Sequence, residues 1–142
     1  MRKGLSLNSL TPLIENLREL KDAVKGIETE KRVGFDLEAD SMYHFSEKVC
    51  LLQVASKKTA FVIDTLKLRD LSLLKPLFLR NDVIKIFHGA DYDVRSLFRD
   101  FGIEIKNLFD TELASRFLGI KETGLEAVLK GRFNVKQDDE HH

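Results

Sequence analysis

Apolar side chains near the start of the chain recur every three or four residues, which is the spacing of one face of a helix. This stripe predicts a helix that begins after Thr11, carries Pro12 in its first turn and ends near Gly26. The stripe consists of Leu13, Ile14, Leu17, Leu20 and Val24. A helix with one apolar face needs a second layer to pack against, and the next segments of the chain can supply it.

Three short apolar segments follow, each bounded by polar residues, as strands are. They span about residues 32–39, 49–56 and 59–66, and only Lys57 and Lys58 separate the last two. Because so short a link joins neighbouring antiparallel strands, the three segments are predicted to form an antiparallel meander.

From residue 71 onward the pattern alternates between helices and strands. A short helix is expected to begin near Ser72, since Pro76 is tolerated only close to a helix start. The later predicted elements are a buried strand at 83–89, a helix at 91–101, a short strand at 105–110 and two helices at 111–118 and 124–133. The whole order predicts one α/β domain at residues 1–136, with a mixed sheet, helices on both faces and a tail at 137–142.

The segment GFDLEAD, residues 34–40, places two carboxylates on a strand that is otherwise apolar. Side chains alternate between the faces of a strand, so Gly34, Asp36 and Glu38 share one face. Two carboxylates one pleat apart repel each other, and a divalent cation removes the conflict, because Mg²⁺ and Mn²⁺ prefer carboxylate oxygens. For this pair by itself, an exposed strand end with two solvated acids is the alternative.

A third acid follows the buried strand at 83–89. In KIFHGADYDVRSL the strand ends at His88, Asp91 is the expected N-cap of the next helix, and Asp93 lies in its first turn. Open α/β sheets usually bind ligands at the C-terminal ends of their strands, so Asp93 is predicted to join Asp36 and Glu38 there and to give a metal site of three carboxylates. A favourable position in the helix dipole is the alternative explanation for Asp93.

Composition narrows the class of protein without identifying it. The chain of 142 residues has 43% hydrophobic and 32% charged residues, as soluble domains do, and its formal net charge is zero. Any nucleic-acid binding must therefore come from a local patch or a bound metal. Cys50 lies in an apolar run and is expected to be a small buried side chain. No apolar run resembles a membrane span or a secretory signal, so a cytoplasmic protein is expected.

Taken together, these segments resemble the motifs of the DEDD-superfamily 3′–5′ exonucleases, ribonuclease D-like branch. GFDLEAD resembles the first exonuclease motif, VCLLQVAS the strand after it, and FHGADYDVRSL the second motif. FDTELASRFLG and GLEAVLK are similar to the stretches that follow in ribonuclease D-like proteins. The resemblance covers roughly residues 30–135.

The resemblance implies a ribonuclease H-like mixed sheet with strand order 3-2-1-4-5. It assigns the catalytic and metal-binding carboxylates to Asp36, Glu38 and Asp93, which in the complete family site hold two Mg²⁺ or Mn²⁺ ions. It further implies hydrolysis of phosphodiester bonds at the 3′ ends of single-stranded RNA or DNA, and the ribonuclease D likeness favours RNA.

Four other residues are predicted to bind substrate. Met42, Tyr43 and His44 follow the first motif and are placed to flank the terminal base and sugar. His88 is a candidate for a hydrogen bond to a phosphate or a metal-bound water, and a structural histidine that closes its strand is the equal alternative. Asp110 is expected to cap the helix after it rather than to bind metal.

The third motif of the ribonuclease D branch, a tyrosine three or four residues before an aspartate, has no counterpart in this sequence. Tyr43 and Tyr92 are the only tyrosines, and neither precedes an aspartate at that distance. The C-terminal helices of the fold are therefore expected to be missing, and the chain alone is expected to be feebly active at best. One hypothesis is an exonuclease domain whose third motif is supplied elsewhere; the other is a catalytically impaired nucleic-acid-binding domain. An uncovered apolar surface would favour a protein partner or self-association.

Overall fold

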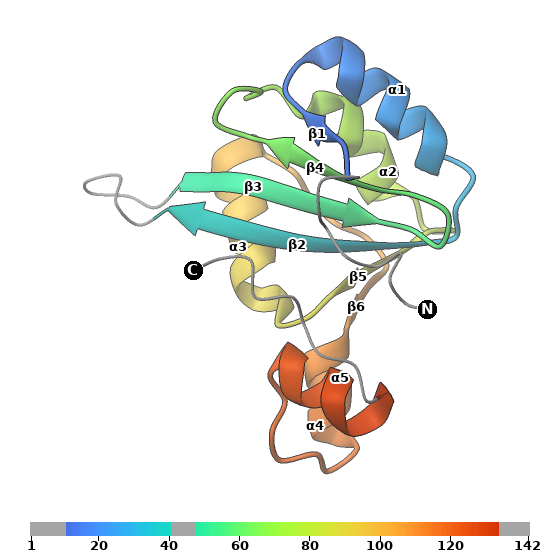
Figure 1. The fold of residues 1–142 in the computed structure, drawn as a ribbon, viewed down its shortest axis with the longest axis vertical. Coiled ribbons are helices and arrows are strands. Elements are labelled where there is room, and N and C mark those ends of the chain that lie inside the picture. Colours follow the sequence, from blue (N-terminus) through green and yellow to red (C-terminus); the bar gives the residue numbers. More distant parts are fainter. Residues whose placement is uncertain (1–10, 41–47, 134–142) are drawn as a thin grey trace.

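A mixed sheet of six strands forms the centre of the computed structural model, which describes residues 11–40 and 48–133 (Figure 1). The strands are β1 (Leu13–Ile14), β2 (Arg32–Asp40), β3 (Lys48–Ala55), β4 (Ala60–Asp64), β5 (Ile84–Phe87) and β6 (Leu108–Asp110). Their order across the sheet is β1-β4-β3-β2-β5-β6. The pairs β2–β3 and β3–β4 are antiparallel, and the pairs β1–β4, β2–β5 and β5–β6 are parallel. Apart from the added edge strand β1, this is the predicted order 3-2-1-4-5.

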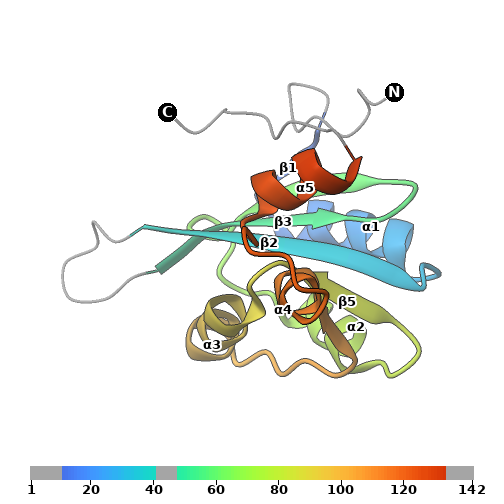
Figure 2. The ribbon, with the colours of Figure 1, turned by 90° about the horizontal axis from the view of Figure 1, so that it is seen from below.

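Helices lie on both sides of this sheet, as predicted. They are α1 (Leu17–Ile27), α2 (Lys75–Leu79), which follows a 3₁₀ turn, η2 (Ser72–Leu74), then α3 (Ala90–Phe101), α4 (Thr111–Phe117) and α5 (Leu125–Phe133). Figure 2 shows α2 and α3 on one side of the sheet and α5 on the other. Within the described part of the chain, none of the helices has the length and apolar character needed to cross a membrane.

The central strand β2 separates an apolar face from a polar one. Val33, Phe35 and Leu37 are buried, and the ring of Phe35 packs against Phe78 of α2 and Phe87 of β5 at centroid distances of 4.6 and 5.5 Å. Because side chains alternate along a strand, Asp36 and Glu38 lie on the face opposite this core. The predicted alternation of GFDLEAD is confirmed.

The predicted start of the first helix is wrong. Leu13 and Ile14 form β1 and pair with β4, and the backbone N–H of Val62 donates to the Pro12 carbonyl oxygen at 2.9 Å. The helix begins only after Asn16, whose side chain accepts a hydrogen bond from the backbone N–H of Glu19. Glu19 in turn accepts from the backbone N–H of Glu15. The Asn16 cap defines the helix start.

Exposed apolar side chains gather on β6 and α4, at one edge of the sheet. They are Leu108, Phe109, Leu113 and Phe117, with Leu118 just beyond α4. Such a group is typical of surfaces that another protein segment covers. Association with a partner or with a second copy stays a prediction.

Candidate functional site

The candidate site lies where β5 ends beside the longer parallel strand β2. Gly34 of β2 is paired with Ile86 of β5, so Asp36, two residues further along β2, lies level with the point where β5 stops after Phe87. The chain leaves the sheet there and turns into α3 (Figure 1). The exposed Asp36 side chain is therefore next to an open corner of the sheet, as predicted for a ligand site.

The turn from β5 into α3 depends on Gly89, which has a left-handed backbone conformation with φ of 74°. Gly89 is the N-cap of α3, and Ala90 is its first residue. The prediction that Asp91 caps this helix is wrong. Asp91 lies in the first turn, exposed, and forms an ion pair of 2.9 Å with Arg95. The helix starts earlier because a carboxylate from another strand, Asp110, accepts the N–H groups at its start.

Asp93 is the buried acid of the site, with 7% of its surface exposed. Burial is the largest cause that raises the pKa of its carboxyl, to about 7, and the negative charges of Asp36 and Asp110 act in the same direction. A hydrogen bond from the Leu37 backbone opposes the shift. Asp93 therefore interacts with the charge of Asp36 and with the backbone of Leu37. The structure thus brings Asp36 and Asp93, both predicted as site residues, close to each other.

Glu38 lies further along β2, close to Cys50 of β3. The Cys50 thiol donates a hydrogen bond of 3.2 Å to the Glu38 carbonyl oxygen. Burial, followed by the charges of Glu38 and Asp40, raises the pKa of that thiol. In residues 11–40 and 48–133, no three His, Cys, Asp or Glu side chains are arranged closely enough to hold a metal ion. The structure thus pairs Asp36 with Asp93, and the contribution of Glu38 to a metal site stays a prediction.

The paired carboxylates nevertheless fit a divalent cation. Mg²⁺ is commonly bound in proteins by one or two carboxylates together with water and substrate phosphates. The raised pKa of Asp93 indicates that, among residues 11–40 and 48–133, its buried negative charge is not balanced by a counter-charge. A divalent cation between Asp36 and Asp93 would supply that charge, and hard oxygen donors suit Mg²⁺ or Mn²⁺.

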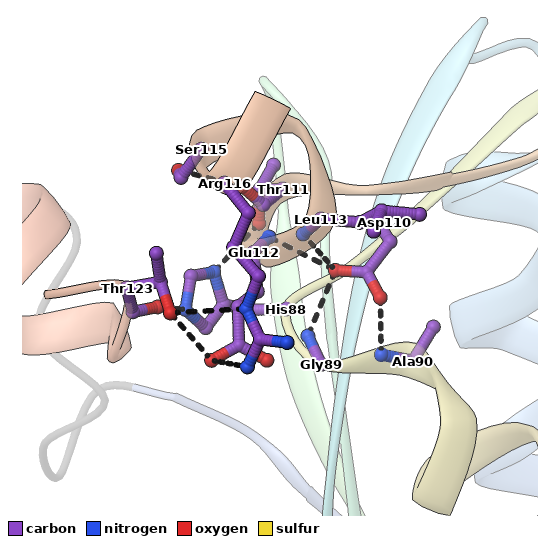
Figure 3. Close-up of polar contacts among 10 residues, drawn as sticks. All are labelled: His88, Gly89, Ala90, Asp110, Thr111, Glu112, Leu113, Ser115, Arg116 and Thr123. Atoms are coloured by element: carbon purple, nitrogen blue, oxygen red, sulfur yellow. Dashed lines mark hydrogen bonds and ion pairs between the residues drawn. The ribbon is translucent and has the colours of Figure 1, made fainter. Parts of the chain in front are cut away.

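His88 is engaged by the protein through both ring nitrogens (Figure 3). Its Nδ1 lies 2.8 Å from the Thr111 hydroxyl, and its Nε2 donates to the Thr123 carbonyl oxygen at 2.6 Å. The Thr111 hydroxyl is also 3.1 Å from the Phe87 carbonyl oxygen. These contacts tie the end of β5 to α4 and to the segment before α5, which favours the structural alternative for His88. A contact with phosphate stays a prediction.

The remaining predicted substrate residues, Met42, Tyr43 and His44, lie outside the described residues. The sequence predicted only part of the structural role of Asp110. Its capping of α4 was expected and is confirmed, because it accepts from the backbone N–H groups of Glu112 and Leu113. Its contacts with the start of α3 join two segments that are distant in the sequence, and no local pattern reveals them.

Comparison with known proteins finds relatives of this chain. A sequence model of the 3′-5′ exonuclease family matches residues 12–142. The chain is 32% identical over 124 residues to the exosome complex exonuclease RRP6 of Saccharomyces cerevisiae and 34% identical over 129 residues to exosome complex component 10 of Homo sapiens. These matches cover 87% and 90% of this chain but only 17% and 15% of the two relatives, so the chain spans less than a quarter of their length.

Solved structures show the same fold. The catalytic core of RRP6 from Trypanosoma brucei is similar with a TM-score of 0.86 and 34% identity, and the match covers 96% of this chain and 38% of that one. RNase D of Escherichia coli, described as an exoribonuclease involved in structured RNA processing, is similar with a TM-score of 0.83 and 20% identity. That match covers 92% of this chain and 35% of RNase D.

Proposed function

Because the chain belongs to the 3′–5′ exonuclease family, in its ribonuclease D-like branch, we propose that it is a metal-dependent exonuclease domain that removes nucleotides from the 3′ end of single-stranded RNA. The observation that carries the proposal is the buried carboxylate of Asp93 near Asp36, at the point where β5 ends beside β2. We propose RNA rather than DNA as the substrate because RNase D of Escherichia coli, which has a similar structure, is described as an exoribonuclease.

Asp36 and Asp93 are proposed to hold the cation, with Glu38 as a third ligand on the same face of β2. The family generally uses divalent metal ions, and Mg²⁺ or Mn²⁺, two ions in the complete site, are proposed here. When bound, such ions lower the pKa of water and neutralise charge on the phosphate that is attacked. The exposed side of Asp36 leaves room for a phosphate to approach the pair.

In the proposed reaction, a water oxygen bonds to the phosphorus of the last phosphodiester. The bond from that phosphorus to the 3′ oxygen of the preceding nucleotide breaks, the attacking water loses one proton to solvent, and the 3′ oxygen takes up one proton from solvent. Asp93 accepts a hydrogen bond from the Leu37 backbone, which would keep its carboxylate beside Asp36 as an oxygen ligand for the cation. Met42, Tyr43 and His44 are proposed to contact the terminal nucleotide.

The comparisons favour this function over a catalytically impaired binding domain, since the matched family and the RRP6 of Saccharomyces cerevisiae are named as exonucleases. A direct assay separates the two. Purified chain is incubated with single-stranded RNA labelled at its 3′ end, with Mg²⁺, with Mn²⁺ or with chelator. Release of the labelled mononucleotide that requires metal supports the exonuclease.

Two substitutions assign the activity to the site. Asp36→Asn should abolish release, whereas Asp22→Asn, which changes an exposed acid of α1, should leave it unchanged. Metal-dependent binding of RNA without cleavage would support the binding domain instead. If neither binding nor cleavage requires metal, the assignment of the site is wrong.

A further inference from the structure

The carboxylate of Asp110, at the end of β6, accepts four backbone hydrogen bonds (Figure 3). Its Oδ1 accepts from the N–H groups of Gly89 and Glu112, both at 2.9 Å, and of Leu113 at 3.2 Å. Its Oδ2 accepts from the N–H of Ala90 at 2.7 Å. One side chain therefore binds the start of α3 and the start of α4 together.

The sheet brings these two helix starts together. β5 and β6 are parallel, and Phe87 is paired with Asp110, so both strands end at the same level and each leads into a helix. The backbone N–H groups at a helix start have no partner within the helix and attract negative charge. Burial acts to raise the pKa of Asp110, but its backbone hydrogen bonds outweigh this effect and hold the pKa below its usual value.

The backbone conformation of Gly89 directs the start of α3 toward the Asp110 carboxylate. Its left-handed conformation disfavours other residues, and an added Cβ would also lie 3.2 Å from the Glu112 Oε1 atom. The N–H groups of Gly89 and Ala90 thereby point to Asp110. Asp93 lies three residues after Ala90, in the same first turn. The position of Asp93 therefore depends on the bonds that hold this turn.

We propose that Asp110 is a positioning residue of the metal site: by holding the first turn of α3, it sets the position of Asp93 relative to Asp36 and thereby the affinity of the pair for a divalent cation. This inference rests on the proposed function, because it concerns the same site. It extends the role of Asp110 beyond the cap of α4. Residues that orient metal ligands commonly affect metal affinity by about 10- to 100-fold.

Asp110→Asn separates the two roles of this side chain. The single oxygen of asparagine is expected to take the place of Oδ1, where it keeps three of the four hydrogen bonds, including both bonds to α4. The amide nitrogen then faces the N–H of Ala90, so one donor meets another and that bond is lost. Asp91→Asn is the matched control, since it also removes one negative charge close to the start of α3 but touches none of these bonds.

Two measurements on the full chain test the inference. Amide hydrogen exchange should become faster at Ala90 in Asp110→Asn, while Glu112 and Leu113 keep their protection. A calorimetric titration with Mn²⁺ should give a dissociation constant roughly tenfold or more above wild type for Asp110→Asn and within about twofold for Asp91→Asn.

The outcomes distinguish this inference from the proposed function. If wild type binds Mn²⁺ and Asp110→Asn binds it equally well, Asp110 does not position the site and the inference alone is wrong. An equal loss of affinity in Asp110→Asn and Asp91→Asn would assign the effect to charge and would also overturn it. If wild type itself binds no Mn²⁺, the proposed function fails, and the inference fails with it.

Discussion

Asp93 should make the metal-free protein less stable at alkaline pH than an otherwise identical protein with a neutral side chain there. Its pKa is raised to about 7 in the folded state, and an aspartate in an unfolded chain has a pKa of about 3.9. The folded state thus binds more protons between these values, so this group's contribution to the free energy of unfolding falls as pH rises from about 4 to about 7. A difference of about three units corresponds to about 4 kcal/mol.

Asp93→Asn isolates this contribution, because asparagine has nearly the same shape and no charge to bury. In chelator, urea unfolding at pH 8 should show Asp93→Asn to be more stable than wild type by up to about 4 kcal/mol. At pH 4 the wild-type carboxyl is neutral in the folded protein, and the two proteins should agree within about 1 kcal/mol. Asp91→Asn, on the exposed side of the same helix turn, should show no stabilisation at either pH.

The same pair of proteins tests whether metal relieves this cost. Mn²⁺ at about 100 times its dissociation constant should stabilise wild type by about 2.7 kcal/mol at pH 8, and Asp93→Asn far less. Two results would show that the buried charge of Asp93 does not destabilise the metal-free protein. One is that Asp93→Asn is no more stable than wild type in chelator at pH 8. The other is that the difference in stability between the two proteins is the same at pH 4 as at pH 8.

Four other substitutions have expected outcomes in denaturant unfolding. Gly89→Ala should destabilise the protein by about 1–2 kcal/mol, because the φ of Gly89 is 74°. Gly26→Ala in α1, where the added Cβ has open space around it, should stabilise the protein by up to about 1 kcal/mol. Equal effects of the two substitutions would contradict backbone strain at position 89. His88→Ala should lower the free energy of unfolding by about 2 kcal/mol, because the two hydrogen bonds of the ring are lost, and should leave the KM for RNA unchanged. A raised KM at unchanged stability would instead support a substrate contact. Lys85→Met should cost about 2–3 kcal/mol, because the buried Lys85 ammonium donates to the carbonyl oxygens of Arg80 and Lys106; a neutral effect would show that water replaces it.

The features of this fold that could be predicted are those that local sequence determines. The alternation of Asp36 and Glu38 with buried apolar residues defines the two faces of β2, and Gly102 ends α3 as expected. The strand order came from the resemblance to a family, since short apolar segments do not specify which of them pair. The pairing of Asp36 with Asp93 followed from the rule that strand ends carry ligand sites.

The errors arose where distant segments determine local structure. Asn16 and Glu19 have the spacing of a capping box, but Pro12 and the apolar stripe favoured an earlier helix start, and only the pairing of Leu13 and Ile14 with β4 excludes it. Asp91 is a good N-cap by residue type. It is displaced because Asp110, about 20 residues later, accepts the first N–H groups of α3.

Calorimetric titration with Mn²⁺ at pH 8 measures whether Asp36 and Asp93 together form a divalent-cation site. Wild type and the exposed-acid control Asp22→Asn should bind Mn²⁺ with the same affinity, and Asp36→Asn and Asp93→Asn should each bind it at least about tenfold more weakly. Undiminished binding in Asp93→Asn would contradict the account, because the buried carboxylate would then have no part in holding the metal.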